Sequence, residues 1–438
     1  MENQKFMGKL KEVKLMTLNP GHFHAGLVQK FMYDQIDPVV HVYAPDGPDV
    51  QGYLNQIKGY NTREENPTTW EEIVYTGNDY LQEMIRAEQG NVVVLSGNNE
   101  KKIEYISKSV NAGINVLADK PMIIYPDDFE ELKAVFKTAS EKGVLLYDIM
   151  TERFEITSIM QKELSHQSAV FGELLKGTLE EPAVTKESVH HFFKYVSGNP
   201  IKRPAWFFDV RQQGEGVVDI TTHLVDLIQW ACFPEVAIDY TNDVEVLSAR
   251  RWATDLTPSM FGIVTGLDNY PEYLLKDVIN DSILQVYSNG EMNYTLKGVH
   301  VKTSVIWNYI APEGGSDTHY SVMRGSRANL IIRQDREQNY KPMLYVKKIA
   351  DETDEVFEKA LVQTIASLSG TYPGVEVERA GAEWLINIPD RYKIGHEAHF
   401  AEVTKKYLKY LVEGMPEWEI TNMIAKYYTT TKGYDMSR

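Results

Sequence analysis

The sequence predicts an N-terminal domain with a doubly wound parallel β-sheet and a C-terminal α+β domain with a mostly antiparallel, open sheet. The first 150 residues alternate short apolar segments with amphipathic ones, which is the pattern of parallel strands joined by helices. Beyond them, strand-like segments follow one another with glycine-containing turns between several of them. We therefore expect one domain over residues 1–150 and a second over residues 151–438, which ends in a helical C-terminal extension.

Composition narrows the class of protein. The chain has 438 residues, of which 43% are hydrophobic and 24% charged, as in ordinary globular proteins. The formal net charge of −17 argues against nucleic acid and against an anionic membrane surface as partners. A single cysteine, Cys232, excludes an internal disulfide and a cysteine-based zinc site. The first residues are polar and no long apolar run follows, so we expect a cytoplasmic protein.

The strands of the first domain are expected where apolar runs stand between turn signals. They are Val13–Leu18, Val39–Ala44, Asn91–Ser96, Asn115–Asp119 and Val144–Asp148. Helices are expected from the first loop to about residue 35, and near 51–60, 79–88, 100–112 and 128–142. Because crossovers between parallel strands are right-handed, the loops at the strand carboxyl ends should share one edge, where ligands bind.

The second domain is expected to begin with a helix over residues 152–166 and a strand over 188–195. Later strands are expected at 245–250, 282–287, 294–308, 319–334 and 343–348, with turns at Asn289–Gly290, Gly314–Gly315 and Gly325–Ser326. Two helices, near 397–413 and 417–430, should close the chain.

The first loop, Asn19-Pro-Gly21-His22-Phe-His24, stands where a dinucleotide fingerprint would stand but keeps only its middle glycine. We expect Asn19, Gly21 and His22 to contact the cofactor, although an ordinary turn between a strand and a helix explains the sequence equally well. Asp46 follows the second strand, as a ribose-binding carboxylate does, and favours NAD over NADP. A turn or helix-capping aspartate is the alternative for Asp46.

Ser96 and Asn98 close the next strand and are also cofactor-binding candidates.

The segment from Gly214 to Trp230 predicts a largely buried helix. Asp219, His223 and Asp226 recur at i, i+4 and i+7, so these polar groups share one face. Buried polar groups are costly unless they are paired. The arrangement is therefore either a satisfied pair in the core or a catalytic pair, in which the imidazole takes a proton near neutral pH.

Two motifs resemble one family. Ala118-Asp-Lys120-Pro121-Met resembles the Glu-Lys-Pro signature of the Gfo/Idh/MocA oxidoreductases. Gly214–Trp230 resembles that family's G-G-G-x-x-x-D-x-x-x-H-x-x-D motif, with Glu215 in place of the middle glycine. The resemblance covers about residues 12–335, and the order of the motifs also fits. The extended C-terminal region, with phrases such as Gly395–Phe400, is similar to a Bacteroidetes-type subgroup.

The resemblance implies that residues 1–150 form an NAD(P)-binding Rossmann domain and that residues 151–438 form a substrate-binding and oligomerisation domain. The open sheet of the second domain would pack against another subunit, hence a homodimer or homotetramer. It implies NAD(P)-dependent hydride transfer at a secondary alcohol of a sugar, glycoside or polyol. Lys120, Asp219 and His223 match the family's catalytic residues, and the Lys120–Pro121 peptide, commonly cis in the family, would help to hold the cofactor. His223 would act as the base, Asp219 would orient it, and Lys120 would hold the substrate hydroxyl and the cofactor ribose.

His191 and Trp206 are expected to line the substrate pocket with Lys120, Asp219 and His223. Two other functions remain open: an NAD-retaining glycosidase or lyase that oxidises a sugar transiently, and a non-catalytic protein that binds a dinucleotide or a sugar. We expect no bound metal, because His396 and His399 do not have the i, i+4 spacing of a zinc-binding helix. His22, His24, His396 and His399 are scattered in sequence and could still converge.

Overall fold

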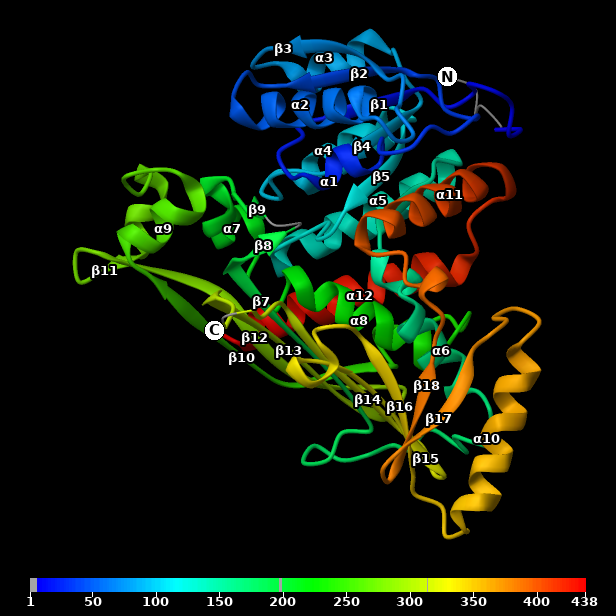
Figure 1. The fold of residues 1–438 in the computed structure, drawn as a ribbon. Helices are drawn as coiled ribbons and strands as arrows, with labels where there is room; N and C mark the ends of the chain where they lie inside the picture. Colours follow the sequence, from blue (N-terminus) through cyan, green and yellow to red (C-terminus); the bar gives the residue numbers. More distant parts are fainter. Residues whose placement is uncertain (1–5, 197–198, 313) are drawn as a thin grey trace. The chain divides into compact units, whose positions relative to one another are not determined.

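A computed structural model describes residues 6–196, 199–312 and 314–438, which divide into two compact units (Figure 1). Unit 1 runs to Thr151 and also contains Trp206–Gly214 and His396–Tyr427. Unit 2 contains Glu152–Ala205, Glu215–Gly395 and Tyr428–Arg438. The sequence gives no sign that segments so far along the chain return to the N-terminal unit.

Unit 1 is built on a parallel sheet with the strand order β3-β2-β1-β4-β5-β6. This order is that of a doubly wound nucleotide-binding fold and confirms the predicted class. Strands β1, β4, β5 and β6 are buried along their whole length, which explains why they read as continuous apolar runs. The strands are β1 Leu15–Leu18, β2 Val39–Ala44, β3 Glu71–Thr76, β4 Val92–Leu95, β5 Asn115–Asp119 and β6 Leu146–Ile149.

The helices of unit 1 cover its sheet, and the late helix α11 contacts both β6 and α1. Helix α5 ends at Gly143, which takes a left-handed conformation (φ 63°) where the chain turns back toward β6. The helices are α1 His24–Leu27, α2 Pro48–Thr62, α3 Tyr80–Ala87, α4 Lys102–Asn111, α5 Phe129–Lys142, α7 Val210–Gln213, α11 His396–Glu413 and, shared with unit 2, α12 Glu417–Met436.

Two expectations for unit 1 were wrong. The helix after the first loop ends at Leu27 instead of near residue 35. Side chains take the carbonyls that would continue it: Trp70 Nε1 donates to the Gln29 carbonyl at 2.6 Å, and Arg63 Nη2 to the Lys30 carbonyl at 2.7 Å. The edge strand β3 was missed, because its mostly exposed Glu71–Thr76 segment lacks the apolar signal of a buried strand.

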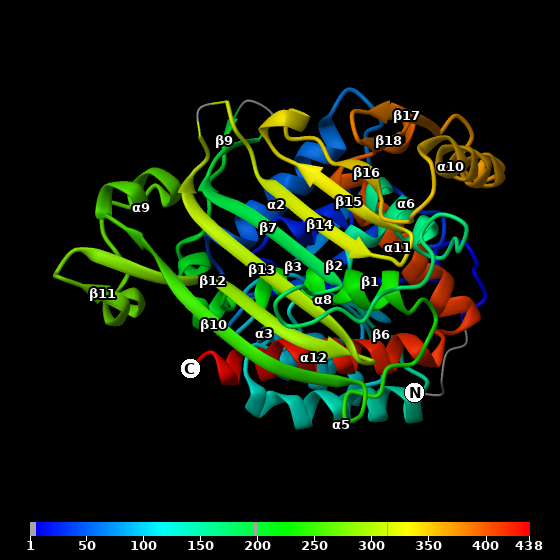
Figure 2. The same cartoon turned by 90° about the horizontal axis from the view of Figure 1, so that it is seen from below.

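Unit 2 is built on a mostly antiparallel sheet with the path β10-β12-β13-β7-β14-β15-β16-β18-β17, and its strands lie side by side in Figure 2. Only the pairing of β7 with β13 along this path is parallel in the described chain. This sheet confirms the predicted α+β class. Its strands are β7 Val184–Phe193, β10 Val244–Leu256, β11 Val278–Ile279, β12 Ile283–Leu296, β13 Val299–Ile310, β14 Thr318–Arg324, β15 Ala328–Gln334, β16 Met343–Lys348, β17 Glu376–Ala380 and β18 Glu383–Asn387. Two further strands, β8 Tyr195–Val196 and β9 Asn199–Pro200, pair only with each other.

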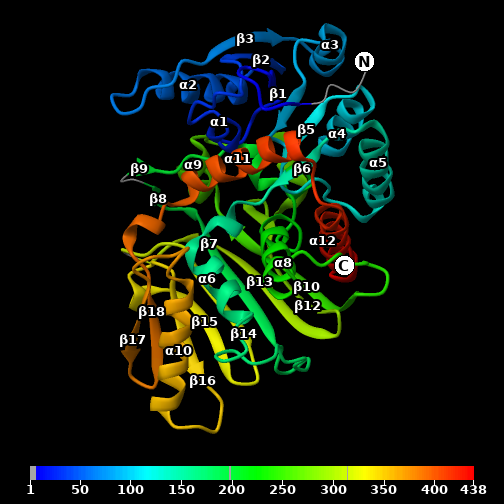
Figure 3. The same cartoon turned by 90° about the vertical axis from the view of Figure 1, so that its right-hand side faces the viewer.

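Two helices pack on one face of this sheet, α6 Ile156–Ser165 and α8 Asp219–Cys232 (Figure 3). They contact each other; α6 also contacts β15 and β16, and α8 contacts β7 and β13. The remaining helices are α9 Pro258–Thr265 and α10 Asp354–Leu368. Among the described residues, no helix is both long enough and apolar enough to cross a membrane.

The predicted turn at Asn289–Gly290 was wrong, because both residues lie inside the continuous strand β12. Gly290 instead allows a second segment of backbone to pack closely against β12. A Cβ at Gly290 would lie 2.6 Å from the Val217 amide nitrogen, and one at Gly216 would lie 2.2 Å from the Ser288 carbonyl oxygen. The backbones of β12 and of the approach to α8 therefore touch where both lack side chains.

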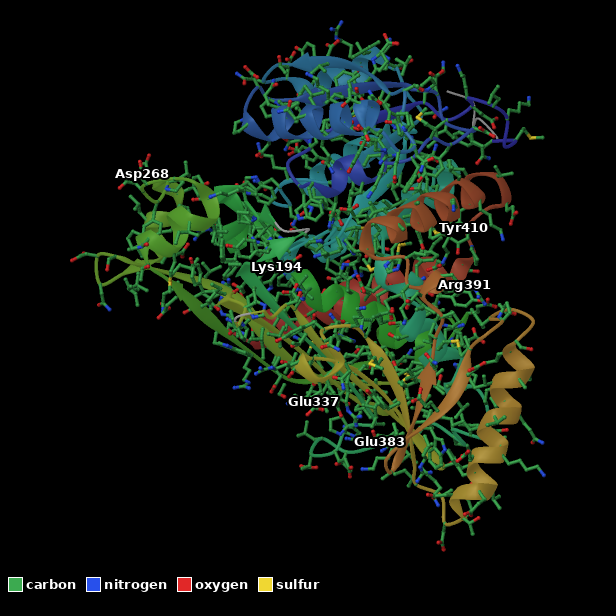
Figure 4. The ribbon with its side chains drawn as sticks, in the orientation of Figure 1. Lys194, Asp268, Glu337, Glu383, Arg391 and Tyr410 are labelled. Carbon is green, nitrogen blue, oxygen red and sulfur yellow. The ribbon has the colours of Figure 1, made fainter. Side chains whose placement is uncertain are left out.

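Several elements of unit 2 were not predicted from the sequence, among them α9, α10 and the hairpin β17–β18. The hairpin turns at Gly381 (φ 63°) and carries charged residues on its exposed face. Glu383 of β18, labelled in Figure 4, pairs in bidentate fashion with Arg333 of β15 at 2.7 and 2.9 Å. Such charged edge strands resemble loops when only the sequence is read.

Candidate functional site

The loop from Asn19 to His24 joins β1 to α1 and packs against the end of β4. Asn19 takes a left-handed conformation (φ 47°). The amides of Gly21 and His22 both donate to the Ser96 carbonyl, at 3.2 and 3.4 Å. A Cβ at Gly97 would lie 2.3 Å from the Asn19 carbonyl oxygen, so only glycine fits there. These contacts bring three cofactor candidates, Asn19, Gly21 and His22, together with a fourth, Ser96.

Asp119, the last residue of β5, organises the polar groups around this loop. Its Oδ2 accepts hydrogen bonds from Ser96 Oγ at 2.9 Å and from His24 Nδ1 at 2.8 Å, and His22 Nδ1 lies 3.9 Å away. Its Oδ1 accepts from the Lys120 amide at 3.0 Å. We call His22, His24 and Asp119 the histidine–aspartate cluster.

Burial and charge set the protonation of this cluster. Burial lowers the pKa of His24, and the Asp119 carboxylate opposes that effect only in part. Burial alone would raise the pKa of Asp119, but His24 and Lys102 hold it well below its usual value. His24 is therefore neutral near pH 7: its Nδ1–H donates to Asp119, and its Nε2 lies 3.3 Å from Nε2 of His396 on α11.

The histidine–aspartate cluster has donor atoms within 4.8 Å of one another, close enough to suggest a metal ion. The neighbouring charges disfavour one. Lys102 Nζ donates to the Asp119 carbonyl at 2.7 Å, and the charge of Lys120 acts on His24. A dication would face two ammonium groups with a single carboxylate to balance them. The expectation of no metal therefore stays a prediction, now with a specific site at which to test it.

A small polar pocket opens at the carboxyl ends of β1, β4 and β5. This position is the switch point of the strand order, where doubly wound sheets bind ligands. The Lys120–Pro121 peptide beside it is cis. The pocket is lined by His22, His24, Gly97, Asn99, Asp119, Lys120 and Gln213.

Two carboxylates follow β2. Asp46 is exposed in the loop between β2 and α2. Asp49, in the first turn of α2, reaches the loop from Asn19 to His24: its Oδ2 lies 2.8 Å from where a Cβ of Gly21 would stand, and it accepts from Trp206 Nε1 at 2.9 Å. Burial raises the pKa of Asp49, and the bond from Trp206 opposes that rise. Asp49 is a second ribose-acid candidate that the sequence reading missed.

In unit 2, α8 carries Asp219 and His223 on a helix that is buried over most of its length, with the two side chains 4% and 9% exposed. The turn before the helix explains its motif. Gly214 has a φ of 106°, and Glu215, which replaces the family's middle glycine, turns its carboxylate to Arg251 and to Arg438.

Asp226, one turn beyond His223, anchors α8. Its carboxylate forms a bidentate ion pair with Arg153, with both N–O distances 2.7 Å and both side chains almost fully buried. Asp226 thus has a structural partner, while Asp219 and His223 occupy the N-terminal half of the same helix.

His191, a predicted substrate residue, lies buried on β7. Its Nδ1 is 3.1 Å from Asp317 Oδ1, and His190 and Lys194 bind the same carboxylate (Lys194 is labelled in Figure 4). Burial alone would raise the pKa of Asp317, but the hydrogen bonds from the two histidines and the charge of Lys194 hold it far below the usual value. The sequence offered no signal for Asp317, which lies more than 120 residues beyond β7.

The remaining candidate site residues belong to different units. Trp206 belongs to unit 1, where its indole binds Asp49, whereas His191, Asp219 and His223 belong to unit 2. Asn98 donates through Nδ2 to Gln212 in unit 1.

Two family models together match most of the chain. Residues 160–438 match the family model described as "Putative oxidoreductase C terminal domain", and residues 29–148 match "Oxidoreductase family, NAD-binding Rossmann fold". A crystal structure of "a putative oxidoreductase from Parabacteroides merdae ATCC 43184" is 55% identical, covers 99% of each chain and superposes with a TM-score of 0.97. The chain belongs to the Gfo/Idh/MocA family of oxidoreductases.

More distant structures share the fold alone. Biliverdin reductase from Synechocystis, in complex with biliverdin and NADP+, is 12% identical, covers 96% of this chain and 98% of its own, and gives a TM-score of 0.56. KijD10, a 3-ketoreductase from Actinomadura kijaniata in complex with NADP and TDP-benzene, is 11% identical, covers 95% of this chain and 96% of its own, and also gives 0.56. No curated protein matches the chain.

Proposed function

We propose that the protein is an NAD-dependent oxidoreductase that transfers a hydride to or from a secondary alcohol of a sugar, glycoside or polyol. The observation that carries this proposal is the polar pocket at the switch point of unit 1, which Lys120 lines. A 3-ketoreductase among the proteins of similar fold supports reaction at a carbinol carbon.

The residues of unit 1 fit a dinucleotide. The pocket lies at the switch point of the sheet. Because residue 97 is a glycine, the loop that begins at Asn19 can pass directly against it. His22, Asn99 and Lys120 offer polar groups to the ligand. Since α1 is a single turn, side chains would hold the phosphates in place of a long helix terminus. When bound, the nicotinamide would supply the hydride acceptor or donor.

We assign the proton chemistry to this chain's own residues. His223 takes the hydroxyl proton of the alcohol, because an imidazole is a competent base near neutral pH. Asp219, one helical turn earlier, stabilises the imidazolium that results. Lys120 binds the substrate oxygen and stabilises its developing negative charge.

The acids after β2 support NAD as the cofactor. Asp46 and Asp49 both follow the strand whose end meets the adenosine ribose in this fold. A carboxylate there accepts hydrogen bonds from a ribose diol and repels a 2′-phosphate. NAD is therefore proposed in preference to NADP.

The experiment is a panel of sugars, glycosides and polyols incubated with NAD or NADP. NADH formation and product analysis are read together. Net NADH with a ketone product supports the dehydrogenase. Release of an aglycone without net NADH identifies instead the NAD-retaining glycosidase or lyase. Failure of the protein to bind either dinucleotide overturns the proposal.

A further inference from the structure

The segment from Trp206 to Gly214, here called the 206–214 strap, belongs to unit 1 although the residues on both sides of it belong to unit 2. Its first residues, including Trp206 and Phe208, are buried, and it ends in the single helical turn α7. Asp209 caps that turn by accepting from the Arg211 amide at 3.1 Å. The strap is thus an ordered piece of chain fastened to the nucleotide-binding unit.

One end of the strap is fastened beside the loop from Asn19 to His24. Trp206 Nε1 donates to Asp49 Oδ2 at 2.9 Å. The Asp49 carboxylate and the Trp206 ring lie 2.8 and 3.4 Å from where a Cβ of Gly21 would stand. Any side chain at position 21 would therefore displace the carboxylate and press on the ring. This anchor lies on the β2–α2 side of the sheet, where the adenosine half of a dinucleotide binds in this fold.

The other end is fastened after β4. The Asn99 amide donates to the Gln212 carbonyl at 2.8 Å, and Asn99 Nδ2 donates to the Gln213 carbonyl at 2.7 Å. Asn98 Nδ2 donates to the side-chain oxygen of Gln212. Gln213 and Asn99 both line the pocket at the switch point. This anchor lies on the opposite side of β1 from the first.

With one anchor after β2 and the other after β4, the strap spans the crevice along which a dinucleotide lies in a doubly wound sheet. We propose that the 206–214 strap closes over the bound dinucleotide and slows its release. This inference rests on the proposed function. Slow release would limit how fast the dehydrogenase exchanges NADH for NAD after each hydride transfer.

The test measures NADH dissociation from the full-length protein by stopped-flow fluorescence, with excess NAD as the chase. Trp206→Phe keeps a ring but removes the donor to Asp49, and Gln212→Ala removes the side-chain acceptor at the other anchor. Trp70→Phe is the matched control, because it removes an indole donor to the Gln29 carbonyl within the same unit. The fraction of cofactor that survives gel filtration is the second readout.

We expect Trp206→Phe to release NADH about tenfold faster, because a hydrogen bond to a charged acceptor is worth roughly that factor. Gln212→Ala should also release it faster, whereas Trp70→Phe should match the wild type. Unchanged release in folded Trp206→Phe and Gln212→Ala proteins overturns the strap proposal, as does equal acceleration by Trp70→Phe. If the wild type binds no NADH, the proposed function falls and the strap proposal falls with it. Binding with unaltered release overturns the strap alone.

Discussion

Lys186 on β7 gives the most quantitative prediction about stability. Its side chain is 1% exposed, and its ammonium donates to two neutral acceptors, Ser321 Oγ at 2.8 Å and Gln161 Oε1 at 3.2 Å. Burial lowers the pKa of Lys186 from 10.5 to about 8, although the charge of Glu155 opposes the shift. A fall of that size corresponds to about 3 kcal/mol at about 1.4 kcal/mol per pKa unit.

The sign of the pH dependence follows from this lowered pKa. Between about pH 8 and pH 10.5 the unfolded chain holds the Lys186 proton and the folded chain does not. Unfolding then takes up a proton, so the free energy of unfolding rises with pH across this window. As the pH falls back to about 8, this gain in stability is lost. Lys186→Met removes the effect, because a methionine does not titrate.

Urea denaturation of the wild type and of Lys186→Met at pH 7, 9 and 10.5 tests this reasoning. The wild type should gain up to about 3 kcal/mol relative to the variant between the lowest and the highest pH. Burial raises the pKa of the Cys232 thiol to about 12, which acts in the opposite direction above pH 9, but the thiol is present in both proteins. Lys137→Met, at an exposed lysine of unit 1, is the matched control. A stability difference that stays constant with pH would refute the account of Lys186.

Three further predictions concern the anchors and the cofactor site. Replacing Arg153 or Asp226 alone with alanine should cost roughly 3–5 kcal/mol, and the double variant should cost much less than the sum, because each single change strands a buried charge; additive costs in urea titrations would contradict this. Asp49→Ala should weaken NAD binding about tenfold and Asp46→Ala by less, since a lost hydrogen bond to a charged group is worth roughly that factor. Calorimetric titration of both variants with NAD measures this, and the reverse order would restore Asp46 as the ribose acid. The purified protein should carry no stoichiometric metal in elemental analysis; a bound ion that His24→Ala removes would show that the histidine–aspartate cluster binds metal.

Sequence periodicity was sufficient to predict an element where the segment is buried on both faces. β5 was predicted to the residue, because its apolar run lies between polar residues. α8 was predicted within a few residues, because apolar residues recur along it and two glycines precede it. The same rule failed at the edges. β3 and β17 present charged residues to solvent, and no apolar period marks them.

The candidate site residues divide in the same way. Lys120, Asp219 and His223 could be named from the sequence because each belongs to a local motif with a fixed spacing. Asp49 and Asp317 could not, because their hydrogen-bond partners, Trp206 and His191, lie far along the chain. Gly290 was misread as a turn, since a glycine that permits close backbone approach cannot be distinguished from a turn glycine without its partner, here Val217.

The central claim is that His223 is the base of a dinucleotide-dependent oxidation. The most direct measurement compares NADH formation by the wild type and by His223→Ala with the substrate identified in the panel, alongside NAD affinity for both proteins. The account predicts that turnover falls by about 100-fold or more, the scale of general-base catalysis, while NAD affinity stays unchanged. Turnover by His223→Ala at the wild-type rate would contradict it.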